Sequence, residues 1–367
     1  MKVNGAFKFH NVGQGLFYSG LLSSKIGSNH NVFSFVYDCG STSSKKLLHH
    51  EIDNFKMSLN EKNKKLDLLV LSHLHDDHIN GIDYLLQDLE VDTVVLPYQT
   101  EVFKLLTLLS TNEDNDVILD FYREPVIWLR NRGVRRVFLV SPEGENYNRG
   151  DLNESYFKTA DSDQFQSIHI KNGGICLPYW EFAFCGINWY GDEEYRAILD
   201  KIIEEKLPVI GELSIENIKL LKKEIEAKFE EDSIKYSVNR TSVIMLHRPL
   251  NTSEYQCYSR FPGRCFNYSF NKHSLDTILT GDIELKENED IPFLTNYMHD
   301  YHILQYPHHG SDKNNMRYFV HLDAIANVVS YGLTNSYMHP HINVREHVPN
   351  LILINERNAF DYQIFVN

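Results

Sequence analysis

The chain has 367 residues, of which 42% are hydrophobic and 23% charged, so it can form a core and is not disordered throughout. Its formal net charge of −14 argues against a protein that coats DNA through bulk electrostatics, because an acidic surface repels polyanions at long range. We find no apolar run long enough for a membrane span and no signal-peptide core, and the five cysteines include no CxxC pair. We therefore expect a cytoplasmic protein with reduced thiols and no membrane partner.

The first hundred residues predict a hairpin and then strand, helix, strand, helix and strand. Paired glycines in Asn11-Val12-Gly13-Gln14-Gly15 separate the two strands of the hairpin, and apolar residues at helical spacing mark the first helix. The predicted elements lie at residues 6–22 (two strands), 32–38, 48–59, 66–71, 82–89 and 92–97.

The rest of the chain predicts more strands, interrupted by a charged helical segment. Between residues 192 and 232 the composition shifts to Glu, Lys, Ile and Leu, which predicts a helical insertion that packs on the body or docks a protein partner. Two helices are predicted within 98–132, strands at 134–140, 168–170, 180–187, 242–246, 277–279, 302–305, 325–330 and 351–354, and helices at 287–298 and 313–321. We predict a single α/β domain over residues 1–367, of αββα type.

The densest chemical signal directly follows the strand predicted at 66–71. His73, His75, Asp77 and His78 offer four metal ligands within six residues, in a loop that can turn them toward one point. The alternative is a histidine-rich solvated turn. We favour a metal site, since imidazole and carboxylate groups are the ligands that divalent cations prefer.

Three later clusters also follow predicted strands. Asp282, in Thr280-Gly281-Asp282, can bridge two cations about 3.5–4 Å apart. Of the adjacent His308 and His309, one is expected to bind metal and the other to contact a phosphate or protonate a leaving group. In His339-Pro340-His341 the proline fixes the backbone, and one of the two histidines is expected to be a ligand.

A local basic cluster has two interpretations. Arg130, Arg132, Arg135 and Arg136 predict either a solvated helix end or a patch that contacts phosphate.

Taken in order, these motifs resemble those of the metallo-β-lactamase superfamily, and within it the hydrolase domain of competence (DNA-uptake) proteins. The matching segments are Asn11–Gly15, Asp38-Cys39-Gly40, His73–His78, Asn239–Ser242, Thr280–Asp282, Pro307–Ser311 and His339–His341. The resemblance implies a metallo-β-lactamase-like αββα sandwich with the site at the shared edge of two sheets.

The resemblance also implies roles for individual residues around one to two divalent ions, Zn or Mn. Such ions lower the pKa of a bridging water and orient it as hydroxide. The implied metal ligands are His73 and His75 for one ion, Asp77, His78 and His339 for the other, and Asp282 between them. The other implied roles are catalysis for Asp77, His308 and His309, orientation of the histidines for Asp38, and substrate binding for Asn239, Ser311 and His341.

The implied activity is that of a metal-dependent phosphodiesterase, with a nuclease favoured and nucleic acid as a candidate partner. The alternatives are a phosphodiesterase for a small substrate, such as a cyclic nucleotide or a phosphorylcholine-type ester, and a metal-binding module that docks a protein through residues 192–232. The chain departs from the family pattern because Asn239 stands near the place where many members have a further histidine. It also contains no transmembrane regions beside the hydrolase motifs.

Overall fold

The structure is a computed structural model of the chain. It describes residues 2–26, 29–59, 64–99, 104, 107, 116–140, 157–159, 169–171, 174–186, 201, 238–250, 255–261, 264–268, 275–284, 301–312 and 324–366. Apart from Lys201, the insertion predicted at 192–232 lies outside these residues, as do the helices predicted at 287–298 and 313–321.

The described strands form two large sheets. The first sheet has the order β13 (Arg264–Tyr268), β12 (Tyr255–Phe261), β18 (Phe360–Val366), β1 (Lys2–Phe9), β2 (Phe17–Ile26), β3 (Asn29–Cys39), β4 (Lys65–Val70), β5 (Glu90–Pro97), β6 (Arg136–Val140) and β7 (Phe157–Thr159). The second has the order β17 (Leu351–Ile354), β16 (Ala324–Ser330), β15 (Tyr301–Gln305), β14 (Thr277–Leu279), β11 (Val243–Pro249), β10 (Trp180–Gly186), β9 (Gly174–Cys176) and β8 (His169–Lys171).

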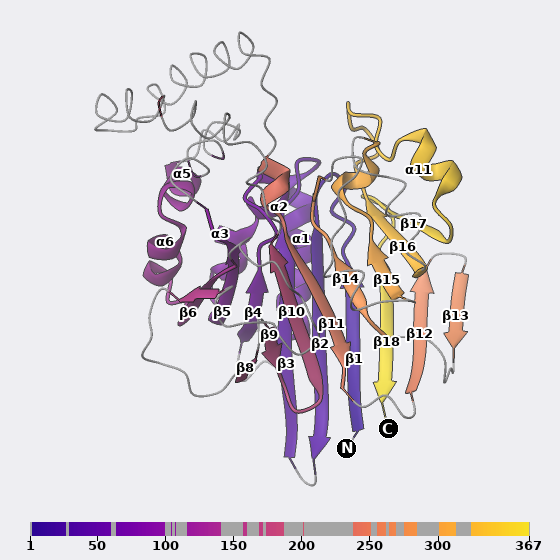
Figure 1. Cartoon of the computed structure of the whole chain (residues 1–367), viewed down its shortest axis with the longest axis horizontal. Helices are drawn as coiled ribbons and strands as arrows, with labels where there is room; N and C mark the ends of the chain where they lie inside the picture. The colour runs from indigo at the N-terminus through magenta and orange to yellow at the C-terminus, as the bar shows by residue number, and fades with distance from the viewer. Residues whose placement is uncertain are drawn as a thin grey trace.

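Each sheet contains a parallel section, and this decides where the loops meet. In the first sheet β3, β4, β5 and β6 are parallel neighbours, and in the second β14, β15, β16 and β17 are. Because the carboxyl ends of parallel strands share one edge, the loops after β3 and β4 lie together, as do those after β14 and β15. Figure 1 shows the short helix α2 (Asp76–Ile79) and the helix α11 (Ile342–His347) at the same end of the sandwich.

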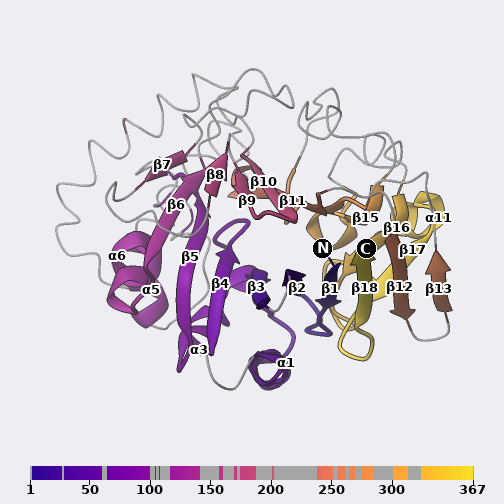
Figure 2. The ribbon, with the colours of Figure 1, turned by 90° about the horizontal axis from the view of Figure 1, so that it is seen from below.

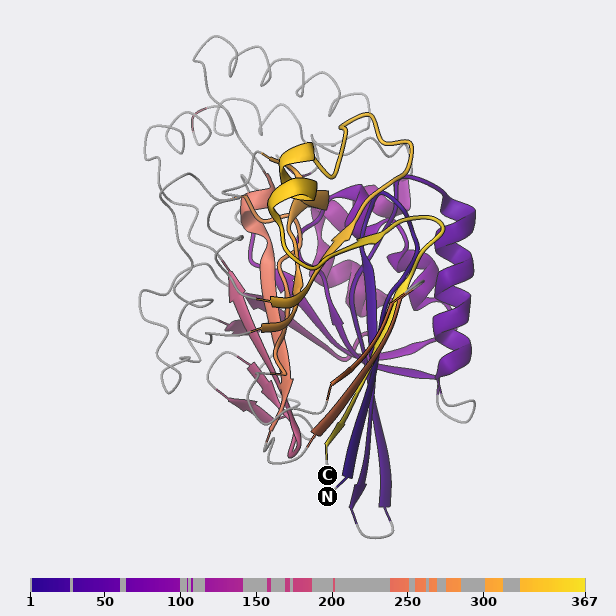
Figure 3. The ribbon, with the colours of Figure 1, turned by 90° about the vertical axis from the view of Figure 1, so that its right-hand side faces the viewer.

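Two apolar clusters hold the layers together. One lies between the first sheet and the helices α1 (Lys45–Ser58), α3 (Ile82–Leu86), α5 (Asp116–Arg123) and α6 (Pro125–Asn131). The other lies between the two sheets and is rich in aromatic rings, including Phe35, Trp180 and Phe182. Figures 2 and 3 show these helices on the outer face of the first sheet, with the second sheet on its opposite face.

A polar chain crosses the core between the sheets. The Trp180 Nε1–H donates to His247 Nδ1 at 3.3 Å, so the proton of this neutral imidazole lies on Nε2, 2.8 Å from the Tyr18 hydroxyl. Tyr18 lies 2.6 Å from the Tyr362 hydroxyl, which lies 2.7 Å from Thr277 Oγ1. These side chains join strands of both sheets, so their bonds help to fix the register of one sheet against the other.

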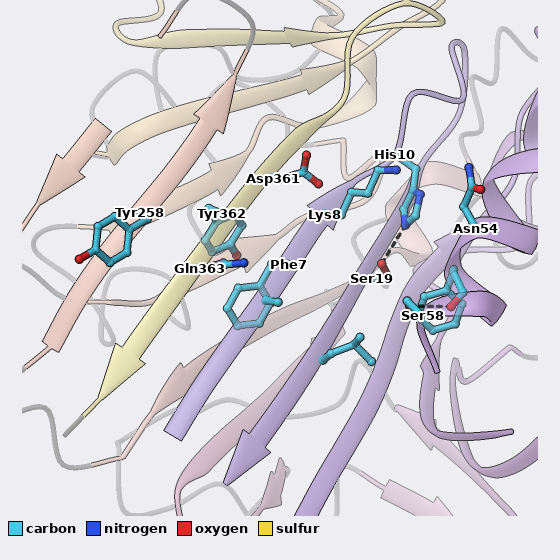
Figure 4. Close-up of a pocket in the computed structure, with 13 residues that line it drawn as sticks. Phe7, Lys8, His10, Ser19, Asn54, Ser58, Tyr258, Asp361, Tyr362 and Gln363 are labelled. Atoms are coloured by element: carbon cyan, nitrogen blue, oxygen red, sulfur yellow. Dashed lines mark hydrogen bonds between the residues drawn. The ribbon is translucent and has the colours of Figure 1, made fainter. Parts of the chain in front are cut away.

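A second polar chain ties α1 to the outer face of the first sheet. There, His10 lies 2.8 Å from both Ser19 Oγ and Glu51 Oε2, and Glu51 also accepts from Lys8 and Asn54. These groups adjoin a cavity of about 560 Å³, open between α1 and the strands β1, β2, β12 and β18 (Figure 4). The contacts run in the order of a hydrolase triad, from Ser19 through His10 to Glu51. Ser19, however, lies in the middle of β2, which pairs with β1 and β3, so the backbone N–H groups around it are used in the sheet. We therefore regard this series of hydrogen-bonded side chains as structural.

The predicted fold class is confirmed. The molecule is a mixed α/β protein with two large sheets and few described helices, arranged as a metallo-β-lactamase-like sandwich. Most predicted strands are found within two or three residues of their expected positions, for example 66–71 as β4 and 302–305 as β15. The hairpin β12–β13, the short strands β7 and β9 and the last strand β18 were not predicted.

Candidate metal centre

The site begins where β3 and β4 end side by side. Asp38, near the end of β3, has a φ of 55° and turns its carboxylate toward the loop that follows β4. Its Oδ1 accepts from the Ser72 N–H and its Oδ2 from the Ser72 hydroxyl, both at 2.6 Å. This fully buried carboxylate therefore holds the first residue of the histidine motif in place.

Asp38 also orients His78, which lies on α2. His78 Nδ1 is 2.7 Å from Asp38 Oδ2, so the Nδ1–H donates to the carboxylate and Nε2 points the other way. His78 Nε2 lies 3.1 Å from Asp282 Oδ1, an ion-pair distance, and among the described residues neither of these buried atoms has a hydrogen-bond partner. Two buried polar atoms that face each other at this distance without a hydrogen bond fit a position that a cation completes.

The loop after β14 brings Asp282 from the second sheet. Gln305 Oε1 accepts from the N–H groups of Thr280 and Gly281 at 2.7 and 2.8 Å, and its Nε2 donates to the Gly281 carbonyl. Gly281 has a φ of 57°, and a Cβ there would lie 2.6 Å from the Ser72 Cβ. Only glycine therefore allows the two loops to approach this closely.

His309 comes from the loop after β15, in the short helix η4 (His308–Gly310). Its Nδ1 lies 2.9 Å from the Ser330 carbonyl oxygen, so the proton is on Nδ1 and Nε2 faces the site. Nε2 is 3.0 Å from Asp77 Oδ2 and 3.4 Å from Asp282 Oδ2.

Four side chains thus converge on one point. Asp77, His78, Asp282 and His309 each offer a ligand atom, and these atoms lie within 4.8 Å of one another. Two carboxylates and two imidazoles are a donor set for Zn²⁺ or Mn²⁺. Together with the unpaired atoms of His78 and Asp282, the four-residue group fits a divalent cation.

The pKa values of the group reflect its negative charge. Burial by itself lowers the pKa of His309, but Asp282 and Asp77 outweigh it and raise this pKa to about 10. The pKa of His78 is likewise raised well above its ordinary value, because Asp282, Asp38 and Asp77 outweigh burial. The carboxylates thus favour positive charge at this point, whether it is carried by protons or by a metal ion.

His73 and His75 lie next to the four-residue group and not within it. The His73 ring centroid is 4.2 Å from that of His78, and His73 Nε2 is 3.2 Å from His75 Nδ1. The Ser72 hydroxyl lies 3.0 Å from His73 Nδ1, which leaves His73 Nε2 directed toward His75. Burial, reinforced by His78 and His75, lowers the pKa of His73, so this imidazole is neutral and has the form that binds metal.

His308 and His339 lie at the rim of the site. The His339 ring centroid is 5.6 Å from that of His308 and 6.2 Å from that of His309. His339 is therefore near the four-residue group but outside it, whereas His309 is inside. Asn239, in the short helix η3 (Val238–Thr241), has its Nδ2 3.3 Å from the His308 ring nitrogens and is buried.

The remaining predicted residues have local partners. His341 accepts from the Asn343 N–H as the N-cap of α11, and its Nε2 lies 3.3 Å from Asp312 Oδ2. Ser311 is buried, and its N–H donates to the His308 carbonyl.

The predicted basic patch lies elsewhere. Arg132 pairs with Asp83, while Arg135 and Arg136 both pair with Asp92. Since β5 and β6 begin beside these pairs and the metal ligands follow strand ends, the arginines belong to the opposite edge of the sheet.

Three residues that support the site were not predicted from the sequence. Ser72 connects Asp38 to the histidine motif, Gln305 holds the Asp282 loop, and Ser330 orients His309 through its carbonyl oxygen. Ser72 could have been found, since it begins the motif. Gln305 lies inside a strand, and its role depends on a loop 24 residues away, so no local signal marks it.

The described helices include none with the length and apolar character of a membrane span.

A search of curated proteins found no match. Residues 30–131, which include Asp38 and the whole of His73–His78, match the family model of the metallo-beta-lactamase superfamily. The match to this superfamily indicates a metal-dependent hydrolase, and the four-residue group could bind the metal. Residues 30–131 are therefore similar to a domain of the metallo-beta-lactamase superfamily.

Proposed function

We propose that the protein is a metal-dependent phosphodiesterase with two adjacent divalent cation sites that share Asp282. The observation that carries this proposal is the convergence of Asp77, His78, Asp282 and His309, whose ligand atoms lie within 4.8 Å of one another, beside the pair His73 and His75. The second site would consist of Asp77, His78, His309 and Asp282. The first would consist of His73, His75 and Asp282, with Zn²⁺ or Mn²⁺ as the ions.

Paired divalent cations would supply Lewis-acid activation of water and would neutralise charge on the attacked phosphoryl group. Side chains around the ligands orient them and hold their loops in place. Asp38 keeps the proton of His78 on Nδ1, and the Ser330 carbonyl keeps that of His309 on Nδ1, so both imidazoles present Nε2 to the site. Gln305 holds the loop that carries the shared carboxylate.

We assign His339 and His308 to the leaving-group side. Both rings lie at the rim, outside the four-residue group. The His339 ring lies against that of His309, which belongs to the group, and against that of His308. Burial, with His309 and His308, lowers the pKa of His339 to about 4, so it is neutral at pH 7 in the free protein. A phosphodiester anion beside it would raise this pKa and let it donate a proton to the departing oxygen.

We infer the substrate class from the histidines at the rim of the site and from the net charge of the protein. A two-cation site with rim histidines suits in-line displacement at phosphorus. The net charge of −14 disfavours long-range attraction of a long nucleic acid and favours short single strands or small phosphodiesters. The interaction-module alternative depends on residues 192–232, which lie outside the described residues apart from Lys201.

The proposal is tested by metal content and activity together. The purified protein, stripped with a chelator and reloaded with Zn²⁺ or Mn²⁺, is expected to bind one to two ions and to cleave bis(p-nitrophenyl) phosphate. Single-stranded DNA, RNA and cyclic nucleotides are then assayed in parallel. His309→Ala is expected to lose one bound ion and at least about 100-fold in activity.

A matched control is His49→Ala. His49 lies on α1, where it stacks on Tyr84 with the ring centroids 3.8 Å apart, and it has no contact with the site. This variant is expected to keep both metal content and activity. Full activity of His309→Ala, or no metal-dependent cleavage of any phosphodiester by the wild-type protein, would reject the proposal.

A further inference from the structure

Apolar side chains gather on the segment that carries His339. Of the eight large hydrophobic residues that are exposed in the described part of the chain, four lie between residues 333 and 342. We refer to these four, Leu333, Tyr337, Met338 and Ile342, as the apolar rim; they are 42%, 69%, 78% and 56% exposed. Such a concentration in ten residues points to a binding surface, because isolated exposed hydrophobic residues are scattered singly on most proteins.

The backbone of this segment is held in place by hydrogen bonds. Asn335 Oδ1 accepts from the His339 N–H at 2.9 Å, and Asn335 Nδ2 donates back to the His339 carbonyl, also at 2.9 Å. The His341 N–H donates to the Gly310 carbonyl, directly after His309, at 2.9 Å. The apolar rim is therefore fixed relative to the four-residue group.

Tyr337 connects the apolar rim to the site. Its ring stacks on His339 with a centroid distance of 5.6 Å and an interplanar angle of 26°, and His339 stacks in turn on His309 at 6.2 Å and 24°. Three rings in series, each stacked on the next, thus lead from the metal ligands to the surface. Since Tyr337 is 69% exposed, most of its ring is open to a further stacking partner.

We propose that Tyr337, flanked by Met338, is a stacking platform for a nucleobase next to the scissile phosphodiester. This inference rests on the proposed function and names its substrate class: a dinucleotide or the end of a single strand. An aromatic ring beside a phosphate-processing site suits a base, because every base offers a π-face at a short fixed distance from its phosphate. One platform in an acidic protein recognises one base and does not require a long basic groove.

The test compares thymidylyl-(3′→5′)-thymidine with its two single abasic analogues, each with the tetrahydrofuran group in place of one base. The metal-loaded wild-type protein is expected to show a KM about tenfold lower for the full dinucleotide than for one of the two analogues. Tyr337→Phe keeps this difference. Tyr337→Leu, which stays apolar but cannot stack, abolishes it while kcat and metal content remain within twofold of wild type.

Tyr258→Leu is the matched control, since Tyr258 is 41% exposed on β12, in the wall of the cavity of Figure 4, and contributes nothing to the metal centre. Equal KM values for all three dinucleotides would overturn the platform while leaving the phosphodiesterase intact. A Tyr337→Leu variant that behaves like wild type would show that any apolar group suffices, as for an acyl chain or a protein partner, and would also overturn it. If the wild-type protein cleaves bis(p-nitrophenyl) phosphate but no dinucleotide, only the platform fails; if it cleaves neither, the proposed function fails as well.

Discussion

Replacing Asp38 by Asn tests whether a residue outside the ligand set controls the metal centre. The carboxylate accepts three hydrogen bonds, from the Ser72 N–H, the Ser72 hydroxyl and His78 Nδ1, at 2.6, 2.6 and 2.7 Å. Asparagine has one acceptor oxygen and one donor amide. If the oxygen stays on Ser72, the amide faces His78 and donates to Nδ1, which moves the imidazole proton to Nε2, the atom that faces Asp282.

The expected effect is a loss of metal affinity. Removing a residue that orients a ligating histidine costs about 10–100-fold in affinity, or about 1.4–2.8 kcal/mol. The loss of charge-assisted bonds to a fully buried group also lowers the free energy of unfolding of the metal-free protein, by about 2 kcal/mol. Ser72→Ala keeps the bond between Asp38 and His78 and is expected to have the smaller effect on affinity.

The assay is a zinc or manganese titration against a competing chromophoric chelator, with urea unfolding in EDTA run alongside. The control is Asp67→Asn, because Asp67 Oδ2 also accepts from a serine N–H and hydroxyl, those of Ser34, at 2.9 and 3.3 Å. Asp67 lies within β4 and touches no histidine of the motif. If Asp38→Asn loses no more metal affinity than Asp67→Asn, the argument that Asp38 sets the His78 tautomer is wrong.

Three further predictions concern His339 at the rim of the metal centre, the buried histidines, and Gln305 in the second sheet. If His339 protonates the leaving oxygen, His339→Ala keeps its metal and loses about 100-fold on a dinucleotide but little on a p-nitrophenyl ester, whose leaving group needs no proton; equal losses on both would contradict that role. Burial lowers the pKa values of His10, His247 and His302 to about 4, 3 and 4, so the folded protein keeps them neutral while the unfolded chain takes up protons below pH 6.5. Stability measured by urea unfolding in EDTA therefore falls as the pH drops from 6.5 toward 4, by about 1.4 kcal/mol per pH unit for each histidine, and His302→Gln should remove one such contribution; an unchanged slope would count against this. Gln305→Met leaves two loop N–H groups without acceptors and should lower the free energy of unfolding by about 2–4 kcal/mol. It should also weaken metal binding, measured by the same titration. Wild-type metal affinity in a folded variant would show that the Asp282 loop keeps its position without Gln305.

Local pattern was enough to predict much of the fold. The apolar segment 66–71, interrupted only by Asp67, favours a buried strand, and it forms β4 at Lys65–Val70. The last strand shows the limit of this method. In β18, buried Phe360, Tyr362 and Ile364 alternate with exposed Asp361 and Gln363, which is a strand pattern, but its place between β12 and β1 depends on pairing with residues at the other end of the chain.

The sequence by itself predicted the kind of chemistry at the centre, because His73, His75, Asp77 and His78 place four candidate ligands within six residues after a buried strand. Asp77 and His78 lie in the four-residue group. Only the tertiary structure decided which distant side chains join them. Asp282 reaches His78 because the two sheets pack face to face, and His309 rather than His339 lies within the four-residue group because the Ser330 carbonyl turns its ring inward. Those contacts depend on strand order and sheet packing across more than 200 residues, which spacing along the chain does not encode.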